Sequence, residues 1–182
     1  MRIIAGTARS RTIDAPKGRD TRPTLDRVRE NLFNILQHRT RDARVLDLFS
    51  GSGALSLEAL SRGADFAVMV DHDLAAHQCE KANASRLGFE DRARIMRCDW
   101  QQAVRTLASE GERFDLVFLD PPYAIRDLSP VMEALKPLLS DDALVIVEHE
   151  ARVMPATAQG YEMTDTRKYG YCGVSMFARC GA

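Results

Sequence analysis

The pattern of apolar and polar positions divides the chain near residue 44. From there on, short apolar runs predict strands over 45–49, 66–70, 94–98, 114–119 and 144–147. Helical spacing and capping residues between them predict helices over 54–62, 74–87, 101–107 and 129–139. Two last strands, 162–168 and 174–179, are separated by a segment short enough for an antiparallel hairpin. Strands that alternate with helices are typical of an α/β protein built on a mainly parallel sheet.

The residues before this point follow a different pattern. Residues 2–4 and 11–13 flank a polar turn and suggest a small β-hairpin. A helix is predicted to begin near Thr24, with Asp26 in its first turn, because apolar residues recur at helical spacing: Leu25, Val28, Leu32, Phe33, Ile35 and Leu36. Its apolar face should dock on the main body, while Arg22, Arg27 and Arg29 face elsewhere. We therefore expect a basic extension over 1–43 and a main domain over 44–182.

Composition limits the class of protein. With 182 residues, 45% of them apolar and 28% charged, the chain suits one soluble domain with a small appendage. No apolar run approaches the roughly 18 residues of a membrane span, and the start lacks a signal peptide's apolar core, so we expect a cytoplasmic protein. The cysteines, Cys79, Cys98, Cys172 and Cys180, show no metal-ligand spacing. We expect reduced thiols in the core and no bound metal.

Charge is distributed unevenly, although the net charge is only −1. Residues 1–44 carry a net charge of +6, and residues 45–182 carry −7. A basic segment joined to an acidic domain suggests an anionic partner at one end of the molecule, most commonly a nucleic acid. Solvation of an exposed hairpin and helix would explain the same arginines, and charge alone leaves both interpretations open.

Acidic residues stand at the ends of the predicted strands, where open α/β sheets bind their ligands. Asp47 lies beneath a turn at 50–53, whose glycines, Gly51 and Gly53, allow a ligand to approach the backbone closely. A dinucleotide fingerprint requires a third glycine where this chain has Ser56. The turn therefore fits a nicotinamide site poorly.

Two more acids follow the next strands. Asp71 lies about twenty residues beyond the glycine turn, where a carboxylate can accept both hydroxyls of a ribose. Asp99, followed by Trp100, suits either contact with an adenine or the N-cap of the next helix, and the two roles are compatible. Surface or capping polarity explains His72 and His77, and nothing makes them metal ligands.

The most informative stretch is Asp120-Pro121-Pro122-Tyr123, at the end of the fourth strand. The two prolines fix φ and forbid continuation of a helix or a strand ladder, so the turn is rigid and extended. Its oxygens can accept hydrogen bonds from the exocyclic amine of a nucleobase while the tyrosine ring stacks on that base. A turn that merely ends the strand, with a solvent-facing tyrosine, is the alternative.

Three motifs, residues 22–24 with 26–36, residues 47–55 and residues 120–123, together resemble the RsmD family. These are 16S rRNA (guanine-N2)-methyltransferases of the class I S-adenosylmethionine-dependent superfamily, and the resemblance spans nearly the whole chain. It implies a Rossmann-like α/β fold with a seven-stranded, mostly parallel, doubly wound sheet that ends in an antiparallel hairpin. It also implies methyl transfer to the exocyclic N2 of one guanine in bacterial small-subunit rRNA.

The resemblance also implies roles for individual residues. S-adenosylmethionine would be held by Asp47, Phe49, Gly51, Gly53, Asp71, His72, Asp99, Trp100 and Asp120. The catalytic turn would comprise Asp120, Pro121, Pro122 and Tyr123, and RNA would contact Arg22, Arg27 and Arg29. Ser50 stands where many relatives carry alanine, and we expect no consequence. The implied partner is 16S rRNA, within a 30S subunit or an assembly intermediate, and we expect a monomer that binds neither membrane nor metal.

Other functions stay open on the sequence alone. A DNA adenine-N6 methyltransferase uses a similar tetrapeptide, but no segment here is long enough for a target-recognition insertion. A nonenzymatic RNA-binding or ribosome assembly factor would not require acids at four strand ends, which would repel phosphate. A nicotinamide dehydrogenase is remote, because Ser56 and the tetrapeptide both argue against it.

Overall fold

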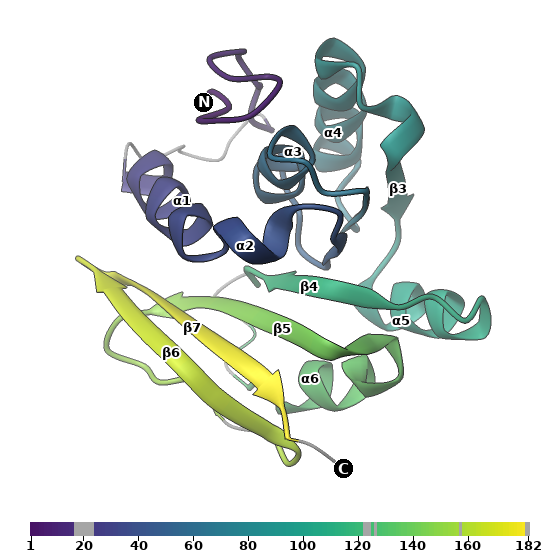
Figure 1. The fold of residues 1–182 in the computed structure, drawn as a ribbon. Coiled ribbons are helices and arrows are strands. Elements are labelled where there is room, and N and C mark those ends of the chain that lie inside the picture. The colour runs from purple at the N-terminus through teal and green to yellow at the C-terminus, as the bar shows by residue number, and fades with distance from the viewer. Residues whose placement is uncertain (17–23, 122–124, 126, 157, 181–182) are drawn as a thin grey trace.

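One mixed β-sheet forms the centre of the fold. The computed structural model describes residues 1–16, 24–121, 125, 127–156 and 158–180. Seven strands pair in the order β3-β2-β1-β4-β5-β7-β6 (Figure 1). Strands β1 to β5 are parallel, and β7 runs antiparallel to both β5 and β6. The strands are β1 Arg44–Asp47, β2 Phe66–Asp71, β3 Ala93–Arg97, β4 Phe114–Leu119, β5 Leu139–Glu150, β6 Tyr161–Tyr169 and β7 Cys172–Arg179. This topology confirms the predicted fold class.

Helices cover both faces of the sheet (Figure 1). One face carries α1 (Thr24–Ile35), α2 (Gln37–Thr40), α3 (Ala54–Ser61) and α4 (Leu74–Leu87), and the other carries α5 (Trp100–Ser109) and α6 (Ser129–Leu135). Short 3-10 turns, η1 (Glu90–Arg92) and η2 (Lys136–Leu138), lead into β3 and β5. Strand residues alternate between two buried clusters, so Phe118 packs with α1 and α3 while Val117 packs with α5 and α6. Within the described ranges, no helix is long and apolar enough to cross a membrane.

Local sequence signals placed several helix ends correctly. The side chain of Asp73 caps α4 by accepting hydrogen bonds from the N–H groups of Ala75 and Ala76. Gly88 closes α4 with a φ of 73°, in the left-handed region that glycine favours. Asp99 caps α5 by accepting from the N–H of Gln102 at 2.8 Å. The N-cap interpretation of Asp99 is therefore confirmed.

Strand β5 differs most from its prediction. The apolar run indicated 144–147, but β5 spans Leu139–Glu150, because Leu139 pairs with Phe114 of β4 and Glu150 pairs with Cys172 of β7. Pairing with two neighbours extends the strand through polar positions that carry no apolar signal. The helix predicted over 129–139 ends at Leu135, and the 3-10 turn that follows contains Pro137, which has no N–H for an α-helical bond.

Two smaller predictions also need correction. The N-terminal hairpin forms, but with a single antiparallel bridge between Arg2 and Thr12 in place of two strands. All four cysteines are free, and Cys172 is buried as expected. Cys180, however, is exposed, and Cys79 and Cys98 are half-buried, so the expectation of core positions is wrong for Cys180.

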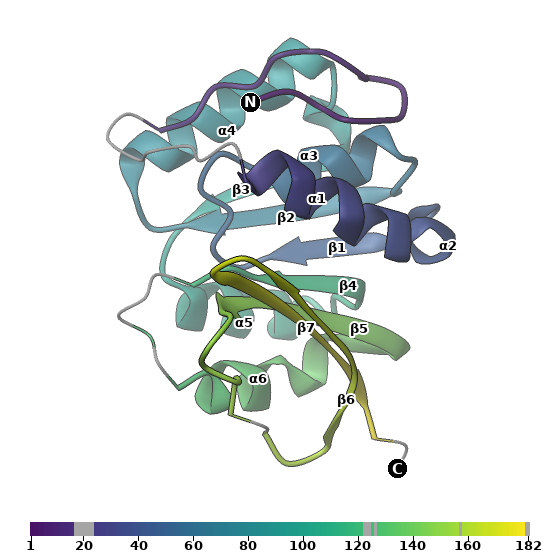
Figure 2. The ribbon, with the colours of Figure 1, turned by 90° about the vertical axis from the view of Figure 1, so that its left-hand side faces the viewer.

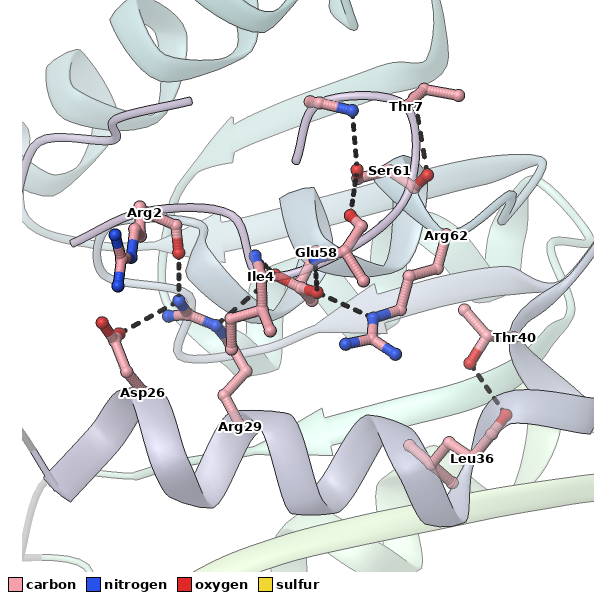
Figure 3. Close-up of polar contacts among 12 residues, drawn as sticks. Arg2, Ile4, Thr7, Asp26, Arg29, Leu36, Thr40, Glu58, Ser61 and Arg62 are labelled. Carbon is pink, nitrogen blue, oxygen red and sulfur yellow. Dashed lines mark hydrogen bonds and ion pairs between the residues drawn. The ribbon is translucent and has the colours of Figure 1, made fainter. Parts of the chain in front are cut away.

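One buried carboxylate fastens the N-terminal segment to α3. Glu58 is fully buried and accepts from the backbone N–H groups of Ile4 at 2.8 Å and Ala5 at 3.1 Å (Figure 3). Its oxygens also lie 2.7 Å from Nε of Arg62 and 3.7 Å from Nε of Arg29. A buried charge is tolerated when it is paired and hydrogen-bonded. Glu58 thereby holds the segment and α1 against α3.

Gly6 allows the same segment to approach α3 closely. Its φ is +83°, and a Cβ atom at this position would lie 1.8 Å from the carbonyl oxygen of Ser61. That carbonyl accepts from the N–H of Thr7 at 2.8 Å, and the Ser61 hydroxyl accepts from the N–H of Ala8 at 3.0 Å. Further along, the segment runs beside α4, where the N–H of Asp14 donates to Oδ1 of Asn83 at 2.8 Å (Figure 2).

Arg29 does not face away from the main body as predicted. Its side chain is 4% exposed, lies 3.1 Å from Oδ1 of Asp26 and donates to the carbonyl of Arg2 (Figure 3). The cation is buried because the ion pair with Glu58 compensates its charge. We therefore withdraw Arg29 from the RNA-contacting set. Arg27 is exposed, and Arg22 lies outside the described residues. The predicted boundary between a basic extension, 1–43, and a main domain, 44–182, stays a prediction.

Candidate active site

The candidate site lies at the carboxyl ends of the central strands. Strand order reverses between β1 and β4, which is where open α/β sheets form a ligand-binding crevice. Asp47 ends β1 opposite Phe118, Asp71 ends β2, and Asp120 directly follows β4. Because parallel strands end at one edge of the sheet, the acids predicted from the sequence are brought to that edge.

The glycine turn is tied to β2 through Asp71. Gly51 and Gly53 have φ values of 57° and 76°, which place both in the left-handed region. The N–H of Gly51 donates to Oδ2 of Asp71 at 3.0 Å, and the N–H of Asp73 donates to Oδ1 at 2.9 Å. A Cβ atom on Gly53 would lie 2.8 Å from Sδ of Met69. The turn is therefore held close to the sheet, with the Asp71 carboxylate oriented by two backbone donors.

Asp47 is buried and weakly bonded. Its carboxylate accepts two long hydrogen bonds, 3.4 Å from the N–H of Phe49 and 3.3 Å from the hydroxyl of Ser56. Burial raises the pKa of Asp47 to about 7; these hydrogen bonds oppose the rise, and the nearby Asp71 adds to it. A buried carboxylate is stabilised by an adjacent positive charge, so the position fits a ligand that brings a cationic group.

A cavity of about 190 Å³ joins the glycine turn to Asp120. Asp47, Phe49 and Gly51 line it from the β1 side, and Asp120 and Glu148 line it from β4 and β5. The rest of the wall includes residues of the N-terminal extension: Met1, Ala15, Pro16, Val28, Arg29 and Leu32. The extension therefore helps to enclose the cavity.

Other predicted residues lie outside this cavity. His72 is 73% exposed, with Nδ1 3.6 Å from Oδ1 of Asp71. Asp99 is exposed at the start of α5, and Trp100 packs against the apolar cluster of α5 and α6. Pro121 is half-buried, whereas Pro122 and Tyr123 fall outside the described residues. No group of three or more potential metal ligands occurs within the described parts of the chain.

Two features of the site were missed in the sequence. Glu148 lines the cavity but was not among the predicted site residues. Its sequence signal is the same as that of the other acids, a carboxylate directly after an apolar run. Ser50, expected to have no consequence, donates to the carbonyl of Val70 at 2.9 Å and hydrogen-bonds to buried Glu80 beneath the glycine turn. Burial raises the pKa of Glu80 to about 8, and the bond with Ser50 opposes the rise.

Sheet order, glycine turn and strand-end acids together define a Rossmann-like fold of the class I methyltransferase type. A family model described as "Conserved hypothetical protein 95" matches residues 1–178. The chain belongs to this family, which confirms the resemblance to RsmD seen in the motifs.

Individual relatives agree with this assignment. Ribosomal RNA small subunit methyltransferase D of Escherichia coli (strain K12) is 41% identical over 152 residues, covering 82% of this chain and 75% of the relative. "Putative rRNA methyltransferase YlbH" of Bacillus subtilis (strain 168) is 36% identical over 184 residues, covering 100% of both. Among solved structures, "Putative methyltransferase yhhF from Escherichia coli" has a TM-score of 0.86 and 34% identity, covering 100% of this chain and 99% of that one.

Proposed function

We propose that the protein transfers a methyl group from S-adenosylmethionine to the exocyclic N2 of a guanine in bacterial 16S rRNA. The observation that carries the proposal is the shared cavity, in which the acid beneath the glycine turn, Asp47, lies with the acid of the D-P-P-Y stretch, Asp120. The rRNA substrate is supported by similarity to small subunit methyltransferase D. The choice of guanine N2 rests on the family resemblance.

The cofactor would lie along the ends of β1 to β3. When bound, S-adenosylmethionine supplies an electrophilic methyl group on a positively charged sulfur. The Asp47 carboxylate suits its cationic end, and the backbone at Gly51 and Gly53 allows close approach. Asp71, already oriented by two N–H donors, retains lone pairs for the ribose hydroxyls. Phe49, His72, Asp99 and Trp100 complete the proposed set.

Asp120 and the Pro121 carbonyl would hold the amine that is methylated. The lone pair of a guanine N2 is delocalised into the ring, so both N–H groups must be engaged to bring the nitrogen toward tetrahedral geometry. Hydrogen bonds that strengthen as the nitrogen becomes positive stabilise the transition state more than the ground state. The new ammonium is strongly acidic, so its proton can leave to Asp120 or to water. Tyr123 would stack on the base, which must be splayed out of the RNA.

The N-terminal extension would position the RNA. Its exposed arginines, represented by Arg27, suit contacts with phosphates, which fix position more than they specify sequence. Because residues of the extension also line the cavity, the phosphates that it binds would be those close to the base that enters the cavity. The proposed partner is small-subunit rRNA, free or within an assembling 30S particle, in the cytoplasm.

Methyl transfer to different nucleic acids tests the proposal. Purified protein and labelled S-adenosylmethionine are incubated with 30S particles, naked 16S rRNA and duplex DNA, and the modified base is identified by mass spectrometry. We expect N2-methylguanine in one or both rRNA substrates. Asp120→Ala should abolish turnover and leave cofactor binding largely intact, whereas the exposed control Asp141→Ala should retain both.

Three results would contradict the proposal. Transfer to DNA alone would favour an adenine-N6 methyltransferase. Absence of S-adenosylmethionine binding by calorimetry would favour a nonenzymatic assembly factor. Near-normal turnover by Asp120→Ala would remove that residue from the mechanism.

A further inference from the structure

Glu148 stands beside Asp120 on the neighbouring strand. In the pairing of β4 with β5, Phe118 is opposite Ile146 and Leu119 is opposite Val147, so the next residues are Asp120 and Glu148. Side chains alternate along a strand, so both acids continue the row of Phe118 and Ile146, which packs in the cluster with α1. Both line the same cavity.

One oxygen of Glu148 is held in place by a thiol. Sγ of Cys172, on β7, lies 3.2 Å from Oε1 of Glu148. Burial raises the pKa of Cys172, and Glu148 and Asp120 raise it further, so the group stays a thiol and donates its proton. No hydrogen bond to Oε2 of Glu148 comes from the described residues. The carboxylate is thus anchored through one oxygen, with acceptor capacity left at the other.

The other charges around the cavity do not neutralise Glu148. Arg29 also lines the cavity, but its guanidinium is paired with Asp26 and Glu58. Burial raises the pKa of Glu148, an effect opposed by the Cys172 thiol and by His149. Glu148 is therefore a basic acceptor group in the wall of the site, and no step proposed above uses it.

The positions of the proposed cofactor residues along the edge of the sheet indicate which part of the substrate would lie at Glu148. The glycine turn, Asp47 and Asp71 occupy the ends of β1 and β2, where the cofactor would bind. A base whose amine reaches Asp120 must therefore extend over the other half of the sheet, toward β5. One of the two ring nitrogens that flank the amine-bearing carbon would then lie at Glu148.

We propose that Glu148 selects guanine by accepting a hydrogen bond from its N1–H, while Asp120 and the Pro121 carbonyl hold N2. This inference rests on the proposed function. In guanine, the exocyclic amine lies between two ring nitrogens, N1, which carries a proton, and N3, which carries a lone pair, and a carboxylate can accept a hydrogen bond from N1–H only. In adenine, the ring nitrogen beside the amine carries a lone pair, which a carboxylate would repel. A flipped base is read along this edge, and a site built to pair with one donor rejects analogues that lack it.

A base analogue separates selection from catalysis. The target guanine, once mapped, is replaced by 2,6-diaminopurine in 16S rRNA assembled by ligation and, where required, reconstituted into 30S particles. The analogue keeps the 2-amino nucleophile but has an unprotonated N1. The wild type should prefer guanine by roughly 100-fold in kcat/KM, because the analogue leaves a buried acceptor without its donor. Glu148→Gln, whose amide can donate to that N1, should reduce the preference at least tenfold.

Matched variants keep the test decisive. Glu150→Gln changes an exposed acid two positions further along β5 and should leave the preference unaltered. Glu148→Asp keeps the charge and should retain part of the preference. Calorimetry with S-adenosylmethionine and a melting curve show whether Glu148→Gln or Glu148→Asp is misfolded. The base preference of whichever variant is folded then tests the proposal.

The outcomes distinguish the two proposals. If the wild type methylates guanine but uses diaminopurine equally well, or if the folded Glu148 variants keep the full preference, the role of Glu148 is overturned and the proposed function stands. An equal change in Glu150→Gln would also overturn it, because a general charge effect would explain the result. If the wild type methylates no guanine, both proposals fail.

Discussion

Replacing Arg29 with methionine separates a structural role for this arginine from contact with RNA. Methionine keeps the apolar stem of the side chain but removes the guanidinium that pairs with fully buried Glu58. After the change, Glu58 keeps Arg62 at 2.7 Å and the two N–H groups of the N-terminal segment. Breaking a buried ion pair costs about 3–5 kcal/mol, and this residual compensation places the loss near 3 kcal/mol. Asp26 is 42% exposed, so its own pair with Arg29 adds little.

The assay is thermal unfolding followed by circular dichroism, together with binding to 16S rRNA at low and high salt. For a chain of this size, about 3 kcal/mol lowers Tm by roughly 6–12 °C. Arg27→Met is the matched control, since Arg27 is exposed on the same helix. It should leave Tm unchanged and weaken RNA binding mainly at low salt. If Arg29→Met kept the wild-type Tm and lost salt-dependent RNA affinity, Arg29 would be a phosphate ligand and the assignment to Glu58 would be refuted.

Three further variants test the buried acids and the docked segment. Asp47 has a pKa of about 7, so wild-type affinity for S-adenosylmethionine, measured by calorimetry, should rise as the carboxylate forms through that pH, and Asp47→Asn should remove this rise. Gly6→Ala should destabilise the fold by roughly 1–3 kcal/mol more in urea unfolding than Gly111→Ala, because the added methyl group overlaps Ser61, whereas Gly111 shares a positive φ but has nothing within 4 Å of its Cβ position. Glu80 has a folded pKa of about 8, above its ordinary 4.5. The free energy of unfolding should therefore fall by up to about 1.4 kcal/mol for each unit that the pH rises between these two values. Glu80→Gln should flatten this slope in urea unfolding.

Each of these expectations has a clear contrary result. A full pH dependence of cofactor affinity in Asp47→Asn would assign the titration to another group. Equal losses in Gly6→Ala and Gly111→Ala would attribute the cost to φ alone and not to the close approach of Ser61. In Glu80→Gln some slope should persist because Asp47 also titrates abnormally, but a slope identical to the wild type would exclude Glu80 as a source.

Local interactions made much of the fold predictable. Asp73 and Gly88 mark the ends of α4, because a cap satisfies backbone groups within a few residues of itself. The apolar run over 114–119 matches β4 at both ends. The predicted length of β5 was too short, because its polar positions join the strand through hydrogen-bonded pairing with β4 and β7, which are distant in sequence.

The candidate site divides in the same way. Asp47 and Asp120 could be placed at one edge from the sequence, because parallel strands bring their carboxyl ends together, and the structure puts both in the cavity wall. His72 follows Asp71 in sequence but is 73% exposed, since the chain turns outward there into the cap of α4. The role of Ser50 could not be predicted, because its partner, Glu80, lies thirty residues further along the chain, on α4.

The order of helices and strands along the chain, the helix caps and the strand ends that carry acids could all be predicted without the structure. All of these follow from periodicity and from contacts within a few residues. Which charged side chains are buried, and which partners they have, depended on how the elements pack together. The pattern of residues along the chain cannot show that Arg29 forms an ion pair with Glu58, or that Glu148 accepts a hydrogen bond from Cys172, because each partner lies on a separate element. Burial of a charge is tolerated only where packing supplies its partner, so packing turned a predicted RNA contact into a structural ion pair.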